Sequence, residues 1–504
     1  MDAAPSLASS RTPSVSSLHI GETTELAMTD GQTQSVAAKI DEIGFGIYQI
    51  QVFLLCAGVI VSEAACLQTA AALSTAIVQE FDIADGIGKS AYMLVTYVGF
   101  VLGTLLSGSC GDALGRRYPM LLAYVGMILS SIGTLCAPSY GLLSFGFFTL
   151  GCFAGVGVPA AFIIVAETSP TSMRGVTSAA MAVAFVLGEL WTAMGFCLFM
   201  PEMTGDHWRF AIAWAALPSI ALTCLASCSR VTRFDTPHFL GVRGSPEELL
   251  AVMNLMAEMN GKPECEMVHG SVSVDRDDAL SMGEALSKLT SGALLLDVGV
   301  IGMMFFVKDI AFYGMGLFWP LAWQESPDVG DLNPATELLL TAALGFPGVA
   351  VAMVLTFALP RRLAFATSAL LCAVGVWAVQ GLLLEDIRLG LTGVVLFKLF
   401  YPTAQMTVFL LPSEIFSTQV RVWSMSLTAA CGRLATLLAP LLINASQLFF
   451  LTLTCTLLVV TAILVWLLPE TKDQELKNSS SQGLAKQDRS SYGSTSSKSA
   501  AELA

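Results

Sequence analysis

The sequence predicts an all-α membrane protein, and two observations lead to this fold class. Of its 504 residues, 54% are hydrophobic and 13% are charged, whereas soluble domains are about a quarter charged. A chain of this composition has more apolar surface than one aqueous core can bury. The apolar segments are also long and continuous, whereas the strands of a transmembrane barrel would be short and alternating. We therefore expect the membrane-spanning elements to be helices.

Twelve apolar segments are long enough to cross a bilayer, for which about 20 residues suffice. They lie at 47–73, 90–109, 119–137, 140–166, 176–200 and 208–228, and at 293–322, 337–359, 363–384, 389–411, 422–444 and 446–468. We predict an N-terminal six-helix bundle at 41–228, a polar cytosolic loop at 229–290 and a C-terminal six-helix bundle at 291–472. Residues 1–40 and 473–504 are rich in small polar residues and are expected to be disordered tails.

Basic residues gather in alternate short loops. If both termini are cytosolic, the inner loops hold Arg116, Arg117, Arg174, Arg361, Arg362 and Arg421. Acidic residues outnumber basic ones in the loops on the other side. The positive-inside rule therefore predicts that both termini and the central loop are cytosolic. It does not distinguish the plasma membrane from an organelle membrane.

Several classes of function are disfavoured. The net charge of −14 disfavours nucleic-acid binding. The 12 cysteines lie mostly in apolar segments and lack the paired spacing of a disulfide or metal framework, so no metal is expected. The sequence has no Walker motif and no nucleophile elbow, which disfavours an ATP-driven pump or an enzyme, and no cofactor is expected.

The chain contains an internal repeat of about 246 residues. Arg116–Arg117 and Arg361–Arg362 lie 245 residues apart, and each pair follows an apolar segment. Glu167 and Glu414 lie 247 apart, and each precedes an arginine by seven residues. Two parallel repeats are typical of transporters whose halves rock about a central site. The same offset places Asp309 of the second half at Glu63 of the first.

Lys308 and Asp309 are adjacent within the apolar segment 293–322. A charge at the bilayer centre costs roughly 2.5–3.5 kcal/mol on insertion scales, so such residues usually have a function. The predicted helices contain the acids Glu63, Glu189 and Asp309 and the cations Lys308, Lys398 and Arg433. These charges balance, which leaves the charge of a substrate open.

Two interpretations of these residues stay open: proton and substrate sites, or structural counter-ions. Adjacent helical residues point about 100° apart, so we expect Lys308 and Asp309 to have different partners. Asp309 and Tyr313 are four residues apart and share one helix face. Glu189 is expected either to accept a proton or to neutralise Lys398 or Arg433.

Residues 108–117 resemble the loop signature G-x-x-x-D-x-x-G-R-R of the major facilitator superfamily, with Asp112, Arg116 and Arg117 in place. The copy in the second half is reduced to Pro360-Arg361-Arg362. The resemblance implies the major facilitator fold: twelve transmembrane helices in two six-helix bundles with both termini cytosolic.

Four further stretches resemble the synaptic vesicle glycoprotein-related and organic-ion transporter branch: 43–49, 236–240, 411–421 and 468–472. This resemblance implies a secondary active transporter that moves a small polar or charged organic solute by alternating access. We expect a monomer in the lipid bilayer, with the proton as coupling ion. Glu63 and Asp309 would then change protonation during the cycle.

The seventh apolar segment, 293–322, is also similar to helix 7 of the proton-coupled phosphate symporters, because Asp309 is followed by Phe312-Tyr313-Gly314. Glu63 falls on their helix 1 acid and Arg433 on their helix 11 lysine. Residues 155–161 lack their helix 4 aspartate, however, and Gln405 stands where their asparagine is expected. Phosphate:proton symport is therefore the first alternative, and a non-transporting membrane receptor of the same fold is the second.

Charged residues at the cytosolic helix ends are expected to form salt bridges between helices that hold an inner gate. We expect this role for Glu167 with Arg174 and for Glu414 with Arg421, together with Asp112, Arg116, Arg117, Arg361 and Arg362. These bridges would break during opening and would not contact the substrate.

Overall fold

The computed structural model describes residues 36–83, 87–205, 207–265, 282–290, 292–325, 332–384, 386–416 and 418–472. The regular elements in these ranges are helices. In chain order they are α1 Val36–Ile43, α2 Ile47–Ala72, α3 Ser74–Glu80, α4 Ile87–Leu114, α5 Arg117–Leu135, α6 Tyr140–Thr168, α7 Arg174–Phe199, α8 Trp208–Cys228, α9 Pro237–Arg243, α10 Pro246–Met259, α11 Met282–Leu289, α12 Gly292–Glu325, α13 Pro334–Ala343, α14 Gly345–Ala358, α15 Arg361–Leu383, α16 Ile387–Ile415, α17 Thr418–Ala445, α18 Gln447–Leu464 and the short 3₁₀ helix η2 Val465–Leu467.

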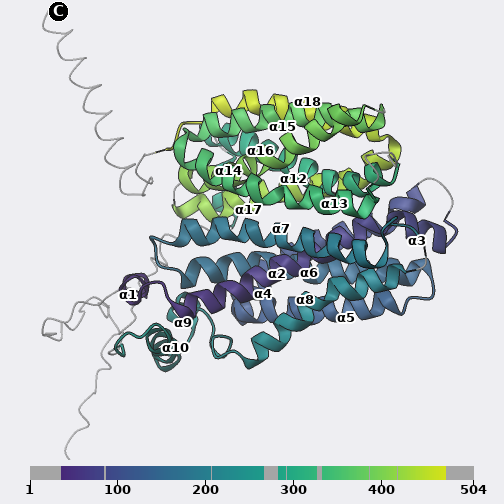
Figure 1. Ribbon diagram of the computed structural model, residues 1–504. Helices are drawn as coiled ribbons and strands as arrows, with labels where there is room; N and C mark the ends of the chain where they lie inside the picture. The colour runs from purple at the N-terminus through teal and green to yellow at the C-terminus, as the bar shows by residue number, and fades with distance from the viewer. Residues whose placement is uncertain are drawn as a thin grey trace, which may run out of the picture.

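The long helices form two packed halves (Figure 1). The N-half comprises α2 to α8, and the C-half comprises α12 to α18. Helices α7 and α4 of the N-half contact α13, α14 and α17 of the C-half. At one end of the molecule α9 and α10 gather beside α1, and α3 lies at the other end. We call these the α10 end and the α3 end.

In the part of the chain that the structure describes, eleven segments are long and apolar enough to cross a membrane. Their bounds lie close to the prediction, and α8 begins and ends at the predicted residues 208–228. The 34-residue α12, which carries Lys308 and Asp309, is not among the eleven. A twelfth span at α12 and the cytosolic location of the termini stay predictions.

The predicted helix 337–359 consists of two helices, α13 and α14, which meet at Leu344. Pro347 explains the break, because proline has no N–H and its ring crowds the carbonyl four residues earlier. Elsewhere the helix starts follow ordinary capping chemistry. The hydroxyl of Ser139 accepts a hydrogen bond from the N–H of Leu142 at the start of α6, and Ser446 does the same for Phe449 at α18.

Helices α4 and α6 cross with their backbones in contact, because each carries a pair of glycines four residues apart. A Cβ on Gly99 would lie 2.2 Å from the carbonyl oxygen of Phe148. A Cβ on Gly151 would lie 2.1 Å from that of Thr96. Small residues at this spacing are typical of helix interfaces in membranes, where tight packing replaces the hydrophobic effect.

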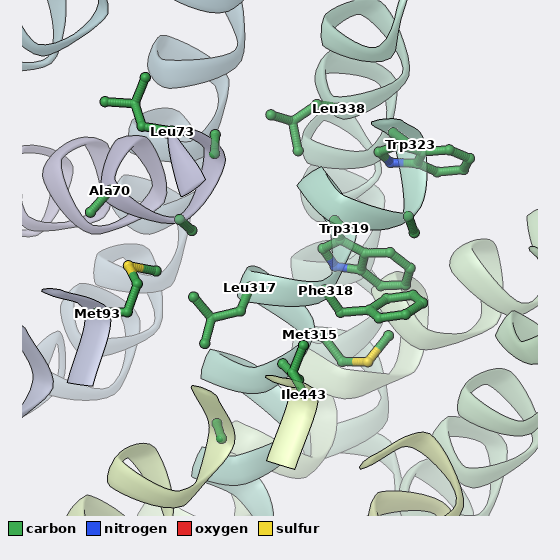
Figure 2. Close-up of a cluster of buried hydrophobic side chains, with 14 of the residues drawn as sticks. Ala70, Leu73, Met93, Met315, Leu317, Phe318, Trp319, Trp323, Leu338 and Ile443 are labelled. Carbon is green, nitrogen blue, oxygen red and sulfur yellow. The ribbon is translucent and has the colours of Figure 1, made fainter. Parts of the chain in front are cut away.

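The two halves are joined at the α3 end by a buried apolar cluster. Figure 2 shows Ala70, Leu73 and Met93 of the N-half on one side of this cluster, and Leu317 and Trp319 of α12 with Leu338 of α13 on the other. Hydrogen bonds support this contact. The backbone N–H of Ala335 donates to the carbonyl of Pro201 at 3.1 Å, and the hydroxyl of Thr75 donates to the side chain of Gln324.

The predicted tail 1–40 is wrong in its last residues, because α1 begins at Val36. Val36 and Ile40 are buried, and α1 packs against α9 and α10. The backbone N–H of Thr171 also donates to the carboxylate of Asp41 at 2.7 Å. The predictions for 1–35, 266–281 and 473–504 lie outside the described residues. The predicted central loop 229–290 contains α9, α10 and α11.

Candidate functional site between the two halves

A small cavity of about 20 Å³ lies between the halves. It is lined by Leu67, Gln68 and Ala71 of α2, Tyr97 of α4, Phe185 and Glu189 of α7, and Phe312, Tyr313 and Gly316 of α12. Four aromatic rings and one carboxylate therefore share a small space. The ring of Phe185 lies 4.8 Å from that of Phe312, so the aromatic wall continues from one half into the other.

A cluster of buried charges lies beside this wall. The ammonium group of Lys308 donates to the carboxylate of Asp309, and both side chains are less than a tenth exposed. Arg433 of α17 approaches the other carboxylate oxygen of Asp309 at 4.0 Å and donates to the hydroxyl of Tyr313 at 3.0 Å. One face of α12 thus presents an acid and a phenol to the same arginine, as their four-residue spacing predicted.

The expectation that Lys308 and Asp309 have separate partners is wrong. Their Cα–Cβ bonds diverge, but a lysine side chain has four flexible carbons and bends back to its neighbour. Aromatic rings hold it there: the ammonium nitrogen lies 4.9 Å from the ring centre of Phe409 and 5.4 Å from that of Phe305. The hydroxyl of Tyr401 donates to the backbone carbonyl of Lys308 at 3.0 Å.

Gly432 brings α17 close to this acid. A Cβ on Gly432 would lie 2.3 Å from a carboxylate oxygen of Asp309 and 3.0 Å from the carbonyl of Phe305. Only glycine leaves room for the carboxylate at that position. The residue next to Arg433 in sequence therefore sets the distance between α12 and α17 at the charge cluster.

Glu189 of the N-half pairs with Lys398 of the C-half. The ammonium nitrogen lies 3.0 Å from each carboxylate oxygen, and both side chains are about nine-tenths buried. Of the roles expected for Glu189, the structure shows the neutralisation of Lys398. Because Glu189 also lines the cavity, this ion pair forms part of its wall.

Glu63 is 3% exposed in the middle of α2, and among the described residues no salt bridge within 4.0 Å reaches it. The charges of Arg433 and Asp309 nevertheless act on its carboxylate. Arg433 also stacks on Phe100 of the N-half, with its guanidinium carbon 4.5 Å from the ring centre. Arg433 therefore contacts both halves, and its charge also acts on Glu63, the buried acid of α2.

Two further polar residues lie on the C-half. Gln405 on α16 is half-buried, and no described hydrogen bond connects it to the charge cluster. Glu337 on α13 is 4% exposed, and one of its carboxylate oxygens has no hydrogen-bond partner in the described part of the chain. The sequence interpretation missed Glu337, because it lies at the predicted edge of its span, where acids are common.

At the α10 end, each half carries a compact polar network. In the N-half the carboxylate of Asp235 accepts hydrogen bonds from the backbone N–H groups of Arg116 and Arg117, which begin α5. Arg116 lies 3.7 Å from Glu167, and the hydroxyl of Thr236 donates to the same acid. Gly115, with φ +97°, makes this possible, because a Cβ there would lie 1.9 Å from Asp235.

The C-half repeats this network. The carboxylate of Glu470 accepts from the backbone N–H groups of Arg361 and Arg362 at 2.8 and 3.2 Å, at the start of α15. Arg361 lies 3.1 Å from Glu414, and the hydroxyl of Thr471 donates to that acid. The internal repeat is thus visible in atomic contacts, and it includes Asp235 and Glu470, which the sequence interpretation had not assigned to the site.

The expected partner of Glu167 therefore needs correction, whereas the pairing of Glu414 with Arg421 stays a prediction. Glu167 pairs with Arg116 and not with Arg174, whose side chain donates to the carbonyl of Ser169 at 3.2 Å. An arginine seven residues away has passed onto the next helix, whereas Arg116 lies directly across the bundle end. The side chains of Asp112 and Arg421 lie outside the described residues. Each network described joins elements of one half, so a gate between the halves at this end stays a prediction.

The sugar (and other) transporter family matches residues 79–481 of the chain. The protein belongs to this family. The match agrees with the resemblance to the major facilitator superfamily, and it identifies the transporter as an integral multi-pass membrane protein that works as a secondary transporter.

Individual relatives are similar over most of their length. Organic cation/carnitine transporter 7 of Arabidopsis thaliana is 22% identical, over 90% of this chain and 98% of that protein. Solute carrier family 22 member 3 of Rattus norvegicus is 24% identical, over 79% of this chain and 69% of that protein. These similarities agree with the resemblance to the organic-ion transporter branch, whereas the phosphate-symporter likeness of α12 stays a prediction.

Solved structures share the fold. The inward-open conformation of the xylose transporter XylE from E. coli has a TM-score of 0.63 at 18% identity, over 85% of this chain and 98% of that one. Its partially occluded inward-open conformation has a TM-score of 0.64 at 16% identity, over 85% and 99% of the two chains. The major facilitator fold is therefore established for this transporter.

Proposed function

We propose that the transporter couples proton movement to the transport of a small organic solute that carries an anionic group. The observation that carries this proposal is the charge balance around Arg433. Lys308 and Arg433 are opposed by Asp309 and, at longer range, by Glu63. With Glu63 ionised the cluster is neutral, and with Glu63 protonated it has one positive charge in excess. Protonation of Glu63 thus gives the site a net positive charge, which attracts an anion.

The cavity wall supports an organic solute. Phe185 and Phe312 face each other across the halves, and Leu67 and Ala71 add apolar surface. Aromatic faces pack well against a carbon skeleton, whereas free phosphate needs many convergent donors. The relatives named for organic cations and carnitine also act on organic molecules by name. The cavity is complete within one chain, which supports transport by a monomer.

Asp309 and the Glu189–Lys398 pair have supporting roles. Asp309 holds Lys308 and Arg433 near the cavity and is the second group to change protonation. The ion pair between Glu189 and Lys398 connects the halves and opens as they rock. The repeated networks around Arg116 and Arg361 hold the bundle ends in shape while the halves move, and the solute crosses without chemical change.

Phosphate:proton symport is a second candidate, favoured by the contact of Asp309 and Tyr313 with one arginine. Both candidates are tested with purified protein in liposomes that contain a pH-sensitive dye. The first predicts that organic anions acidify the lumen and phosphate does not. A response to phosphate alone supports the second. Binding of a solute without any flux favours a receptor and contradicts both.

A mutant pair completes the test. Glu63→Gln is expected to abolish solute-driven proton movement, and Glu247→Gln on the exposed face of α10 is the matched control. Normal proton-driven uptake by both Glu63→Gln and Asp309→Asn would overturn the coupling proposal. Size-exclusion chromatography with light scattering measures the oligomeric state of the same preparation.

A further inference from the structure

Cys224 and Cys228 lie one turn apart near the end of α8 and are both exposed. Of the 12 cysteines, only these two and Cys136 are exposed, whereas the other thiols are buried or partly buried. The transport site uses none of the three. Their positions on the helices determine which environment, and therefore which reactants, the three thiols face.

The two thiols continue the outer face of α8. Leu217 and Ile220 are each 42% exposed on this helix, and Cys224 and Cys228 follow at helical spacing. Helix α8 lies on the side of the N-half away from the C-half (Figure 1). Large exposed aliphatic residues on a membrane-spanning helix face lipid. Both cysteines therefore point toward the bilayer.

Cys228 is the last residue of α8 and lies at the α10 end. Two residues later, Arg230 donates to both carboxylate oxygens of Glu258 on α10, at 3.0 and 2.7 Å. Cys136 lies at the opposite end, because it follows Leu135, whose carbonyl accepts a hydrogen bond from Arg209 at the start of α8. Cys228 therefore lies at the α10 end of the bundle, whereas Cys136 lies at the opposite end.

We propose that Cys224 and Cys228 are sites of S-acylation by long-chain fatty acids. The thiolate sulfur attacks the thioester carbonyl of a fatty acyl-coenzyme A. A new C–S bond forms, the bond to coenzyme A breaks, and coenzyme A leaves as a thiol with the proton lost by the cysteine. This needs the α10 end to be cytosolic, as the basic loops predict, since acyl-coenzyme A is supplied there.

The lipid-facing geometry suits the product. An acyl chain on Cys224 or Cys228 enters the bilayer beside Leu217 and Ile220 without crossing a polar surface. It also lies next to the Arg230–Glu258 pair, which ties α10 to the end of α8. Acylation would therefore anchor the α8–α10 junction at the membrane surface, away from the transport cavity.

The test uses the full-length protein in cells fed an alkyne fatty acid, followed by conjugation to a fluorophore. The expected result is a hydroxylamine-sensitive label that is lost in Cys224→Ala/Cys228→Ala and kept in Cys136→Ala. Equal expression and thermal stability of the variants establish that they fold. A label that survives the double substitution, depends on Cys136 or is absent from the wild-type protein overturns the proposal. Transport by the double variant is expected to persist, which separates this inference from the proposed function.

Discussion

Lys398 on α16 places its ammonium nitrogen 3.0 Å from both carboxylate oxygens of Glu189 on α7, so a buried ion pair joins the two halves beside the cavity. A pair in this place meets two demands. Each charge compensates the other in a buried place, and the pair connects the two halves, which we propose to move apart during transport. Because the two charges neutralise each other, substituting one partner and substituting both are expected to have different effects on stability.

Glu189→Gln is expected to destabilise the protein strongly, because it leaves the buried ammonium of Lys398 without a counter-charge. Removing one partner of a buried pair costs about 3–5 kcal/mol, whereas replacing both partners is often nearly neutral. Glu189→Gln/Lys398→Met is therefore expected to melt closer to the wild-type protein than either single variant. Thermal unfolding in detergent measures this. Additive effects of the two substitutions would contradict the pairing.

Glu63→Gln is expected to separate exchange from accumulation. Glutamine resembles the protonated acid but neither takes up nor releases a proton, so the solute still binds and exchanges across the membrane. Proton-driven uptake should be lost. Counterflow and gradient-driven uptake in the same liposomes distinguish the two activities, with Glu247→Gln as the control. Loss of counterflow as well would show that Glu63 holds the structure or the solute and is not the proton carrier.

The helices were predictable because each span depends on local sequence. A long apolar segment defines α8. The break at Leu344 was not predictable from Pro347 alone, because α8 continues through Pro218. The ionisable residues of the site were predictable for a related reason: Lys308 or Glu189 stands out in an apolar segment. The cost of burying a charge makes each one conspicuous in the sequence alone.

The partners of these residues were not predictable, because pairing depends on which helix faces which. Glu189 and Lys398 are 209 residues apart, and nothing local connects them. Asp235 escaped notice because an acid in a polar loop is ordinary. The internal repeat could have identified it, because Asp235-Thr236 and Glu470-Thr471 both follow the last helix of a half.

Glu470 is expected to make the stability of the C-half depend on pH. Burial opposes ionisation of its carboxyl, but hydrogen bonds from the backbone N–H groups of Lys472, Arg361, Arg362 and Thr471 outweigh it and lower the pKa below the ordinary value of 4.5. A lowered folded-state pKa adds stability that is fully present above about pH 4.5 and is lost as the pH falls through the folded-state pKa. Glu470→Gln should therefore melt below the wild-type protein at pH 7, and the difference should shrink as the pH falls below 4.5. A difference that stays constant over this range would exclude the carboxylate as its cause.

Gly432→Ala is expected to separate α12 from α17 at the charge cluster. The new methyl group would lie 2.3 Å from a carboxylate oxygen of Asp309 and 3.0 Å from the backbone of Phe305, so the carboxylate has to move and the two helices have to separate slightly. Overpacking of this kind typically costs about 1–3 kcal/mol. Gly299→Ala is the matched control, because it lies on α12 and a Cβ there meets nothing within 4 Å. That control should gain up to about 1 kcal/mol from the higher helix propensity of alanine.

The shift caused by Gly432→Ala also moves Arg433 relative to Asp309 and Tyr313. Gly432→Ala should therefore weaken solute binding in a titration, whereas Gly299→Ala should not. Equal binding and equal melting temperatures of the two variants would show that the close approach at Gly432 does not position the arginine.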